Sequence, residues 1–211
     1  MQKIILFILI SSLPSLTFSQ EKSWGYKGYS GGMFVHLGYV QSKHFTILDL
    51  QCNVITQQVK GLTYGMGGKM AFYLNTYFRV GGEGYFSTCK YGEYKNSCRI
   101  GWGGVTFDLL YPVKKWAPFI GVTLGGGSAT HLIFTEKQQN NQDITAVVHF
   151  SNPLSIINPA VGVEFFASNR ISLLFKMDYM INTLKNPYYP QGVRFYLGVH
   201  FSSKKINNSS I

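Results

Sequence analysis

After its first twenty residues the chain alternates large apolar residues with polar or small ones, in long segments separated by turn residues. A period of two is that of a β-strand, whose successive side chains point to opposite faces, whereas amphipathic helices repeat every 3.6 residues. In the segment 170–183, Leu173 and Phe175 fall on one face. Lys176 and Asp178 fall on the other. We expect strands at 32–41, 62–74, 78–90, 97–111, 117–134, 144–168, 170–183 and 191–203.

Composition narrows the class of protein further. Charged residues make up 13% of the chain, against a usual ~25%, while Gly 23, Phe 16 and Tyr 14 suit a β-protein rich in glycine and aromatics. After residue 20 no apolar run approaches the ~18 residues of a transmembrane helix, so a helical membrane protein is excluded. The formal charge is +10, but no Lys/Arg-rich run or nucleic-acid motif concentrates it, so we expect no nucleic-acid partner.

Residues 1–19 have the three parts of a secretory signal peptide. Lys3 supplies the positive start, 4–10 the apolar stretch, and Thr17 and Ser19 the small residues before a cut at Gln20. The apolar stretch is too short to span a bilayer. We therefore expect export from the cytoplasm.

The strands of a soluble β-sandwich also alternate apolar and polar residues, as those of a membrane barrel do. The lengths of the connections between strands must therefore distinguish the two architectures. The connections at 75–77, 113–116 and 168–170 are tight, whereas those at 42–61, 91–96, 135–143 and 184–190 are longer and polar. Short turns at one end and long loops at the other are typical of outer-membrane barrels, with both termini on the periplasmic, short-turn side. The sequence thus predicts an all-β protein, an eight-stranded antiparallel up-and-down transmembrane β-barrel over 20–203, followed by a polar tail at 204–211.

Two details accompany this prediction. Gly103 and Gly104 interrupt the alternation of their segment and predict a β-bulge. Aromatic residues near strand ends, including Trp116 and Phe119, predict interfacial girdles.

The signal peptide with Gln20 at its cut, glycine-rich strands such as the one holding Gly81, Gly82 and Gly84, and the final segment 192–201 resemble the small outer-membrane β-barrel proteins of Gram-negative bacteria, in the style of the Bacteroidota. The resemblance covers residues 20 to 203. It implies a porin-like architecture in the cell outer membrane, contact with outer-membrane lipid and lipopolysaccharide, and insertion by the barrel-assembly machinery. These barrels usually end on an aromatic residue, whereas here Phe201 is followed by polar residues.

Charged residues on the inward faces are expected to fill the lumen, because eight strands enclose only enough room for side chains. A tight turn near residue 76 places Lys69 across from Glu83, and the last hairpin is expected to place Asp178 across from Tyr196. Buried charges are costly unless paired. The predicted lumen ion pairs are Lys69–Glu83, Glu164–Lys176 and Asp178–Arg194. A polar channel, and hence a narrow solute pore, is the alternative.

One segment carries an enzyme hypothesis. His149-Phe150-Ser151-Asn152 is similar to the His-x-Ser-Asn of outer-membrane lipid A deacylases, which implies His149 as base and Ser151 as nucleophile. That family holds the motif on the penultimate strand and its acid on the last, where this chain has no acid. Glu164 would complete the site only if the chain doubled back. We therefore expect a protein that is not an enzyme, with a lipid A acyl hydrolase as the alternative.

Histidines and cysteines supply the remaining candidates. His36 and His200 are expected inward on neighbouring strands, but two histidines without a third ligand make a weak metal site, so we expect lumen hydrogen bonds and no metal or cofactor. Cys89 and Cys98 flank one short loop, which predicts a disulfide in an oxidising periplasm. A bond from Cys52 to either one is the alternative.

The surplus positive charge is expected in loops and turns. Lys43, Lys60, Lys90 and Lys95 are expected outside, and Lys114, Lys115, Lys204 and Lys205 inside. The outer group would attract lipopolysaccharide phosphates. A structural or surface-binding role is the hypothesis that follows, and an accessory barrel of a secretion machine or a soluble periplasmic barrel is a further alternative. No motif indicates a ligand, a partner or an oligomeric state.

Overall fold

The structure is a computed structural model that describes residues 28–48, 54–92, 96–139, 142–184 and 187–203, with no description of the side chains of 135–146. The expected signal peptide and polar tail lie outside these residues.

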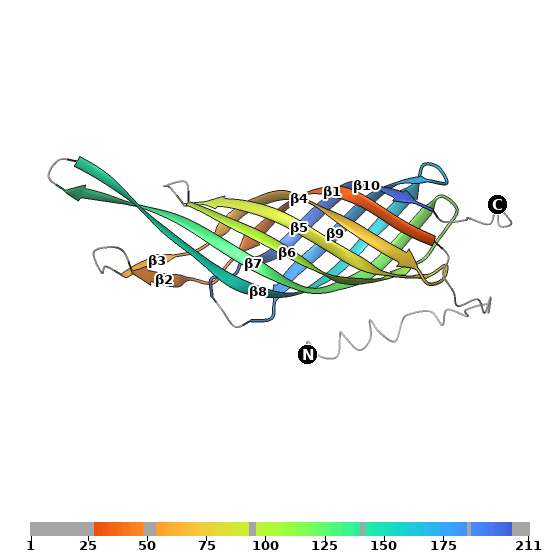
Figure 1. The fold of residues 1–211 in the computed structure, drawn as a ribbon, viewed down its shortest axis with the longest axis horizontal. Helices are drawn as coiled ribbons and strands as arrows, with labels where there is room; N and C mark the ends of the chain where they lie inside the picture. Colours follow the sequence, from red (N-terminus) through yellow and green to blue (C-terminus); the bar gives the residue numbers. More distant parts are fainter. Residues whose placement is uncertain (1–27, 49–53, 93–95, 140–141, 185–186, 204–211) are drawn as a thin grey trace, which may run out of the picture.

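Eight strands close into an antiparallel barrel in the order β1-β10-β9-β8-β7-β6-β5-β4 (Figure 1). They are β1 (Gly28–Gln41), β4 (Lys60–Tyr73), β5 (Phe78–Tyr91), β6 (Asn96–Leu110), β7 (Trp116–Gln139), β8 (Gln142–Phe166), β9 (Ile171–Asn182) and β10 (Gln191–Ser202). Two short strands, β2 (Phe45–Leu48) and β3 (Val54–Gln57), pair with each other outside the barrel. The predicted fold class is confirmed.

The two ends of the barrel differ, as the connection lengths predicted. At one end lie the short connections β4–β5, β6–β7 and β8–β9 and the described ends of the chain, where Ser203 N donates to Tyr29 O. At the other end the β2–β3 hairpin and the outer parts of β7 and β8 extend past the remaining strands (Figure 1). The region 135–143, expected as a loop, is mostly strand, because pairing continues to Gln139 opposite Gln142.

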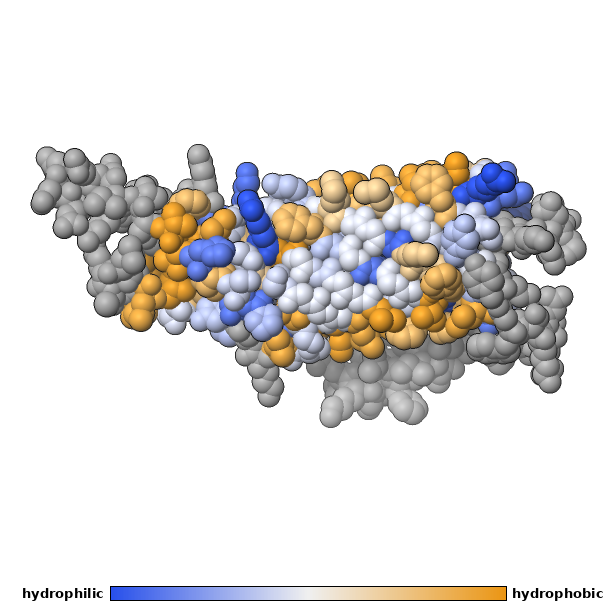
Figure 2. All heavy atoms as spheres, in the orientation of Figure 1, coloured by the Kyte–Doolittle hydropathy of each residue, from blue (hydrophilic) through white to orange (hydrophobic). Residues whose placement is uncertain are grey.

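Side chains on the two faces of the barrel wall differ in burial. Along β9 exposure alternates without interruption from exposed Ile171 to buried Asn182. Met33, Leu37 and Leu62 on the outer face are 71%, 65% and 70% exposed, and large apolar residues form much of the surface seen in Figure 2. Such a surface suits lipid, because a soluble protein rarely exposes so large an apolar area. No helix within the described ranges is long and apolar enough to cross a membrane.

Two expected details are wrong. Phe119 is buried in the lumen, where its ring centroid lies 5.6 Å from the guanidinium carbon of Arg79, and so does not join an interfacial girdle. β6 has no bulge, since Gly103 and Gly104 pair in unbroken register with β5 and β7. A Cβ on inward Gly104 would overlap the Leu124 carbonyl, so this glycine allows close approach of two strands rather than an extra residue.

A pair of glycine variants tests the packing of the wall. On Gly198 a Cβ would overlap the Phe34 ring and the Met33 carbonyl, whereas on Gly101 it would meet nothing within 4 Å. We expect Gly198→Ala to lower the free energy of unfolding by about 1–3 kcal/mol, the usual cost of overpacking. Gly101→Ala, the matched control, should stay near wild type. Urea denaturation in micelles measures both, and equal midpoints for the two variants would contradict the described packing.

Candidate functional site in the barrel lumen

The lumen holds eight charged side chains, all at most 5% exposed. Four are cations, Lys69, Arg79, Lys176 and Arg194, and four are acids, Glu83, Asp108, Glu164 and Asp178. They come from six of the eight barrel strands. Formal charge inside the lumen is therefore balanced, and the net charge of the chain resides elsewhere.

One group of charges is centred on Asp108 of β6. Its Oδ2 accepts from Lys69 Nζ at 2.6 Å and from Arg79 Nε at 2.8 Å. Arg79 also reaches across the lumen from β5 to β8, where its Nη1 donates to Glu164 Oε2 at 2.9 Å. Glu164 Oε1 also accepts a hydrogen bond from Ser172 Oγ, and His200 Nδ1 lies 3.3 Å from the same Glu164 oxygen.

A second group is centred on Glu83 of β5. Lys176 Nζ lies 3.0 Å from Glu83 Oε2 and 3.9 Å from Asp178 Oδ2. Asp178 in turn accepts two hydrogen bonds from Arg194, at 2.9 and 3.0 Å, a bidentate geometry. Lys69 Nζ, 4.0 Å from Glu83 Oε2, links this group to the first.

Aromatic rings close the middle of the lumen around two of these cations. The Tyr85 ring centroid lies 4.8 Å from that of Trp102 and 4.9 Å from that of Tyr196. Lys176 Nζ sits 5.0 and 4.5 Å from the Tyr85 and Tyr196 centroids, and the Arg194 guanidinium 5.2 Å from that of Trp102. These distances favour cation–π attraction.

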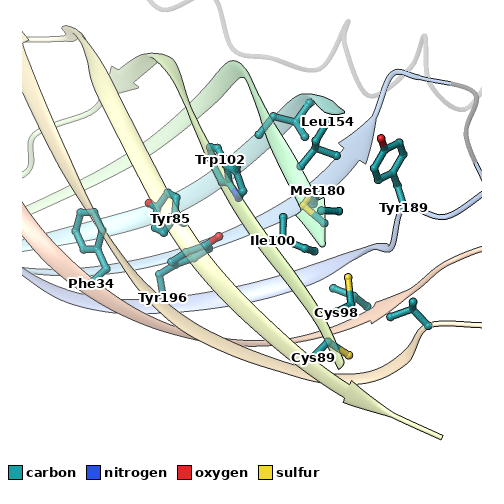
Figure 3. Close-up of a cluster of buried hydrophobic side chains, with 14 of the residues drawn as sticks. Phe34, Tyr85, Cys89, Cys98, Ile100, Trp102, Leu154, Met180, Tyr189 and Tyr196 are labelled. Atoms are coloured by element: carbon teal, nitrogen blue, oxygen red, sulfur yellow. The ribbon is translucent and has the colours of Figure 1, made fainter. Parts of the chain in front are cut away.

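An apolar layer continues from these rings toward the long-loop end. Figure 3 shows Ile100 and Met180 between Trp102 and the two cysteines, with Leu154 on the other side of Met180 and Tyr189 beyond. Phe45 of β2 covers the end of the barrel, with its ring 5.8 Å from that of His131 and 4.9 Å from that of Tyr188. The lumen is thus occupied from the charged groups to the outer mouth.

The structure alters two of the predicted pairs. Lys69 does face Glu83 across β4 and β5, but its ammonium lies nearer Asp108. Glu164 faces Leu174 as expected, yet its cation is Arg79 and not Lys176. The prediction considered only neighbouring strands, whereas a long Arg side chain reaches across the lumen.

The third pair is present with a corrected register. Asp178 lies directly opposite Arg194, and Tyr196, its expected neighbour, lies opposite Lys176. A shift of two residues keeps every side chain on its face, so the inward set is unchanged. Arg79 and Asp108 were not among the predicted site residues. The strand alternation nevertheless places Arg79 on the same inward face as Glu83, and Asp108 on the same inward face as Trp102.

The enzyme candidate is not assembled. His149 and Ser151 face outward on β8, whereas Glu164 is fully buried in the lumen. The strand runs straight from Gln142 to Phe166 without doubling back. Ser151 Oγ accepts a hydrogen bond from Thr130 at 3.2 Å and has no described acid beside it.

The two histidines that were expected inward make hydrogen bonds in the lumen. His36 Nε2 lies 2.5 Å from Ser87 Oγ, and His200 contacts Glu164. The described histidines, cysteines and acids contain no group of three that could hold a metal ion.

The predicted Cys89–Cys98 disulfide is not formed. The two residues are direct cross-strand partners, but both thiols are free and buried. Cys98 Sγ turns toward His131 Nε2, at 3.9 Å, while Cys89 Sγ lies 3.8 Å from Lys90 O, so the sulfurs have separate partners. Cys52 lies outside the described residues.

The surface lysines lie at the two ends of the barrel. Lys43, Lys60 and Lys90 are exposed at the long-loop end, and Lys114 and Lys115 at the short-turn end. The expected Lys95, Lys204 and Lys205 fall outside the described residues.

Solved structures share this fold at low sequence identity. Ail, the attachment invasion locus protein of Yersinia pestis, matches with a TM-score of 0.50 and 11% identity, over 83% of this chain and 99% of that one. The fold is that of an outer-membrane barrel. Neisserial surface protein A matches with a TM-score of 0.49 and 13% identity, over 83% and 96%, and the outer membrane protease OmpT of Escherichia coli with 0.40 and 7%, over 86% and 99%. No protein-family model and no curated protein matches the sequence.

Location follows from the fold together with the apolar outer face. Strands cross a membrane only as closed barrels, and membrane barrels carry an outward apolar band. This barrel is closed and its outer face is rich in exposed large apolar residues. The chain is an outer-membrane barrel.

Variants of Glu83 test which cation depends on it. Glu83→Met leaves Lys176 without its nearest carboxylate in a buried site, and we expect a loss of about 3–5 kcal/mol in the free energy of unfolding. Adding Lys176→Met should recover most of this loss, because the cost comes from the unpaired charge. Adding Lys69→Met instead should not, since Lys69 keeps Asp108. Equal recovery by both second substitutions, measured by urea unfolding, would contradict the two described groups.

Proposed function

We propose that this protein is a non-conducting outer-membrane barrel that serves as a structural or surface-binding element of the cell envelope. It would be exported by a signal peptide at 1–19 and inserted by the barrel-assembly machinery through the strand ending near Phe201. Its lipid partners would be outer-membrane lipid and lipopolysaccharide.

The balance of positive and negative charges in the lumen is the observation that supports this proposal. A porin needs a wet lumen, but here four cations and four acids pair with one another, and the Tyr85, Trp102 and Tyr196 rings lie against them. An interior of this kind joins strands together and gives each buried charge an opposite partner. Long side chains bridging β5 to β8 and β5 to β9 support a structural role.

The long-loop end supports surface binding. β7 and β8 remain paired well beyond Ser97, the outermost residue of β6 that pairs with β7, so a ribbon projects past the barrel wall (Figure 1). On the outer membrane this ribbon would face the surroundings of the cell. A hydrolase is disfavoured because His149 and Ser151 lie outside the barrel and Glu164 inside.

Conductance in planar bilayers tests the closed lumen. We expect the wild-type barrel to show no steady, size-selective current, because paired charges and packed rings occupy the lumen. A Tyr85→Ala, Tyr196→Ala variant, which removes two central rings, should conduct more than wild type. A mobility shift on boiling confirms that each sample is folded. A reproducible open channel in the wild type would replace this proposal with that of a solute pore.

An acyl-release assay tests the enzyme alternative. With lipid A as substrate, wild type and Ser151→Ala should both release no fatty acid above a protein-free control, because Ser151 has no described acid near it. Robust release by the wild type that disappears in Ser151→Ala would show a lipid A hydrolase.

A further inference from the structure

The lipid-facing side of the barrel is recessed over four strands. Gly68, Gly84, Gly103 and Gly126 are consecutive cross-strand partners on β4, β5, β6 and β7. The alternation of inward and outward side chains along each strand places all four glycines on the outer face. We call this row, together with Gly101 and Ser128 in the next row, the glycine recess. In Figure 2 a pale area bordered by orange apolar residues covers this part of the barrel.

Large apolar side chains border the recess on both sides. Toward the short turns stand Met70, Val105 and Leu124, which are 56%, 49% and 46% exposed, with Gly82 between Met70 and Val105. Toward the long loops stand Met66 and Phe86, 57% and 50% exposed. The recess is therefore a trench with a backbone floor and apolar walls, a shape that suits a flexible hydrocarbon chain.

Packing within the barrel does not require three of these glycines, Gly84, Gly101 and Gly103. It does constrain the two ends of the row, since a Cβ on Gly126 would lie 2.9 Å from the Leu154 carbonyl oxygen and one on Gly68 would lie 3.2 Å from that of Gly32. A Cβ would meet nothing within 4 Å at Gly101 and would make only ordinary contacts, at 3.4 Å, at Gly84 and Gly103. Inward Gly104 differs, since a Cβ there would overlap the Leu124 carbonyl. Glycine weakens a strand and marks places where a ligand approaches the backbone, so the three outward glycines that packing does not require point to an occupant from the membrane side.

The trench is open toward the long loops. Phe86, Gly101, Ser128 and Pro153 are consecutive cross-strand partners. The small residues Gly101 and Ser128 leave a gap between the larger side chains of Phe86 and Pro153. The gap leads along β6 to Arg99, which is exposed.

Two exposed cations with no described acid beside them lie at this opening. Arg99 and Lys90 face outward near the outer ends of β6 and β5, whereas every acid whose side chain the structure describes is in the lumen. Hydroxyl side chains stand beside the two cations. Thr88 and Thr130 pair with Arg99, Ser97 pairs with Lys90, and Ser151 follows Thr130. Arginine and lysine bind phosphate, and hydroxyls bond to sugars.

We propose that this wall binds one lipid A moiety of lipopolysaccharide, with a phosphate against Arg99 and Lys90 and an acyl chain in the glycine recess. The inference rests on the proposed outer-membrane setting and defines where lipopolysaccharide binds there. The cations lie at the level of the outer leaflet, because they are at the long-loop end. The hydroxyl groups favour a phosphorylated sugar over a glycerol phosphate.

Native mass spectrometry of the full chain in detergent micelles tests the site, with bisphosphorylated lipid A, phosphatidylglycerol and inorganic phosphate as separate probes. We expect the wild type to retain one lipid A in preference to the other two. Arg99→Gln should weaken retention about tenfold, the effect of a lost charge-assisted contact. Gly101→Leu should weaken it similarly by filling the open trench, and since its Cβ meets no neighbour the barrel should still fold.

Two control variants are matched to these substitutions. Arg170→Gln removes an exposed cation at the short-turn end, and Gly31→Leu adds a leucine on the outer face of β1, where a Cβ comes no nearer than 3.6 Å to another residue. Both should bind lipid A like the wild type. Equal retention of phosphatidylglycerol and lipid A, or undiminished binding by Arg99→Gln or Gly101→Leu, would overturn the proposal. A barrel that is folded and non-conducting but binds no lipid A would refute this site and leave the closed-lumen function intact.

Discussion

Closure of the backbone hydrogen-bond ladder is the constraint on which the rest of this structure depends. In lipid an unpaired N–H or C=O costs several kcal/mol, so a sheet crosses the membrane only without free edges. The pairing of β1 with β10 completes the ring over twelve residue pairs, Ser30–Gln41 with Gln191–Ser202. Closure then brings together strands that are remote in sequence and determines which inward side chains share the lumen.

The charged groups illustrate this dependence. Arg79 and Glu164 are 85 residues apart, and Lys176 and Glu83 are 93 apart, yet each pair lies within hydrogen-bond distance. The penalty for burying a charge falls on each of these side chains, and a remote strand supplies one charged partner of each. Because the charges and rings occupy the lumen, the outer wall and the long-loop end are the surfaces left for interaction.

The outer wall is asymmetric in a way that the lumen is not. On β10 and β1 the row through Val199 and Met33 carries large apolar side chains, while its continuation over β4 to β7 is glycine. Glycine also acts inside, where Gly65 lets His36 reach Ser87, since a Cβ there would lie 2.8 Å from His36 Cε1. Packing thus explains the inward glycines, whereas it does not require the outward Gly84, Gly101 and Gly103.

Local pattern determined the strands, their faces and one register. Alternation alone assigned Lys176, Asp178 and Arg194 to the lumen, and the tight turn near residue 76 placed Lys69 opposite Glu83, because a strand's side-chain period and a hairpin's length are local properties. Only the tertiary structure decided which charges meet. The partnership of Arg79 with Glu164, the nearness of Lys69 to Asp108, and the position of His149 and Ser151 on the opposite face of β8 from Glu164 depend on a closed wall of defined curvature. Curvature of this kind arises from all eight strands together, so no segment of the sequence carries it.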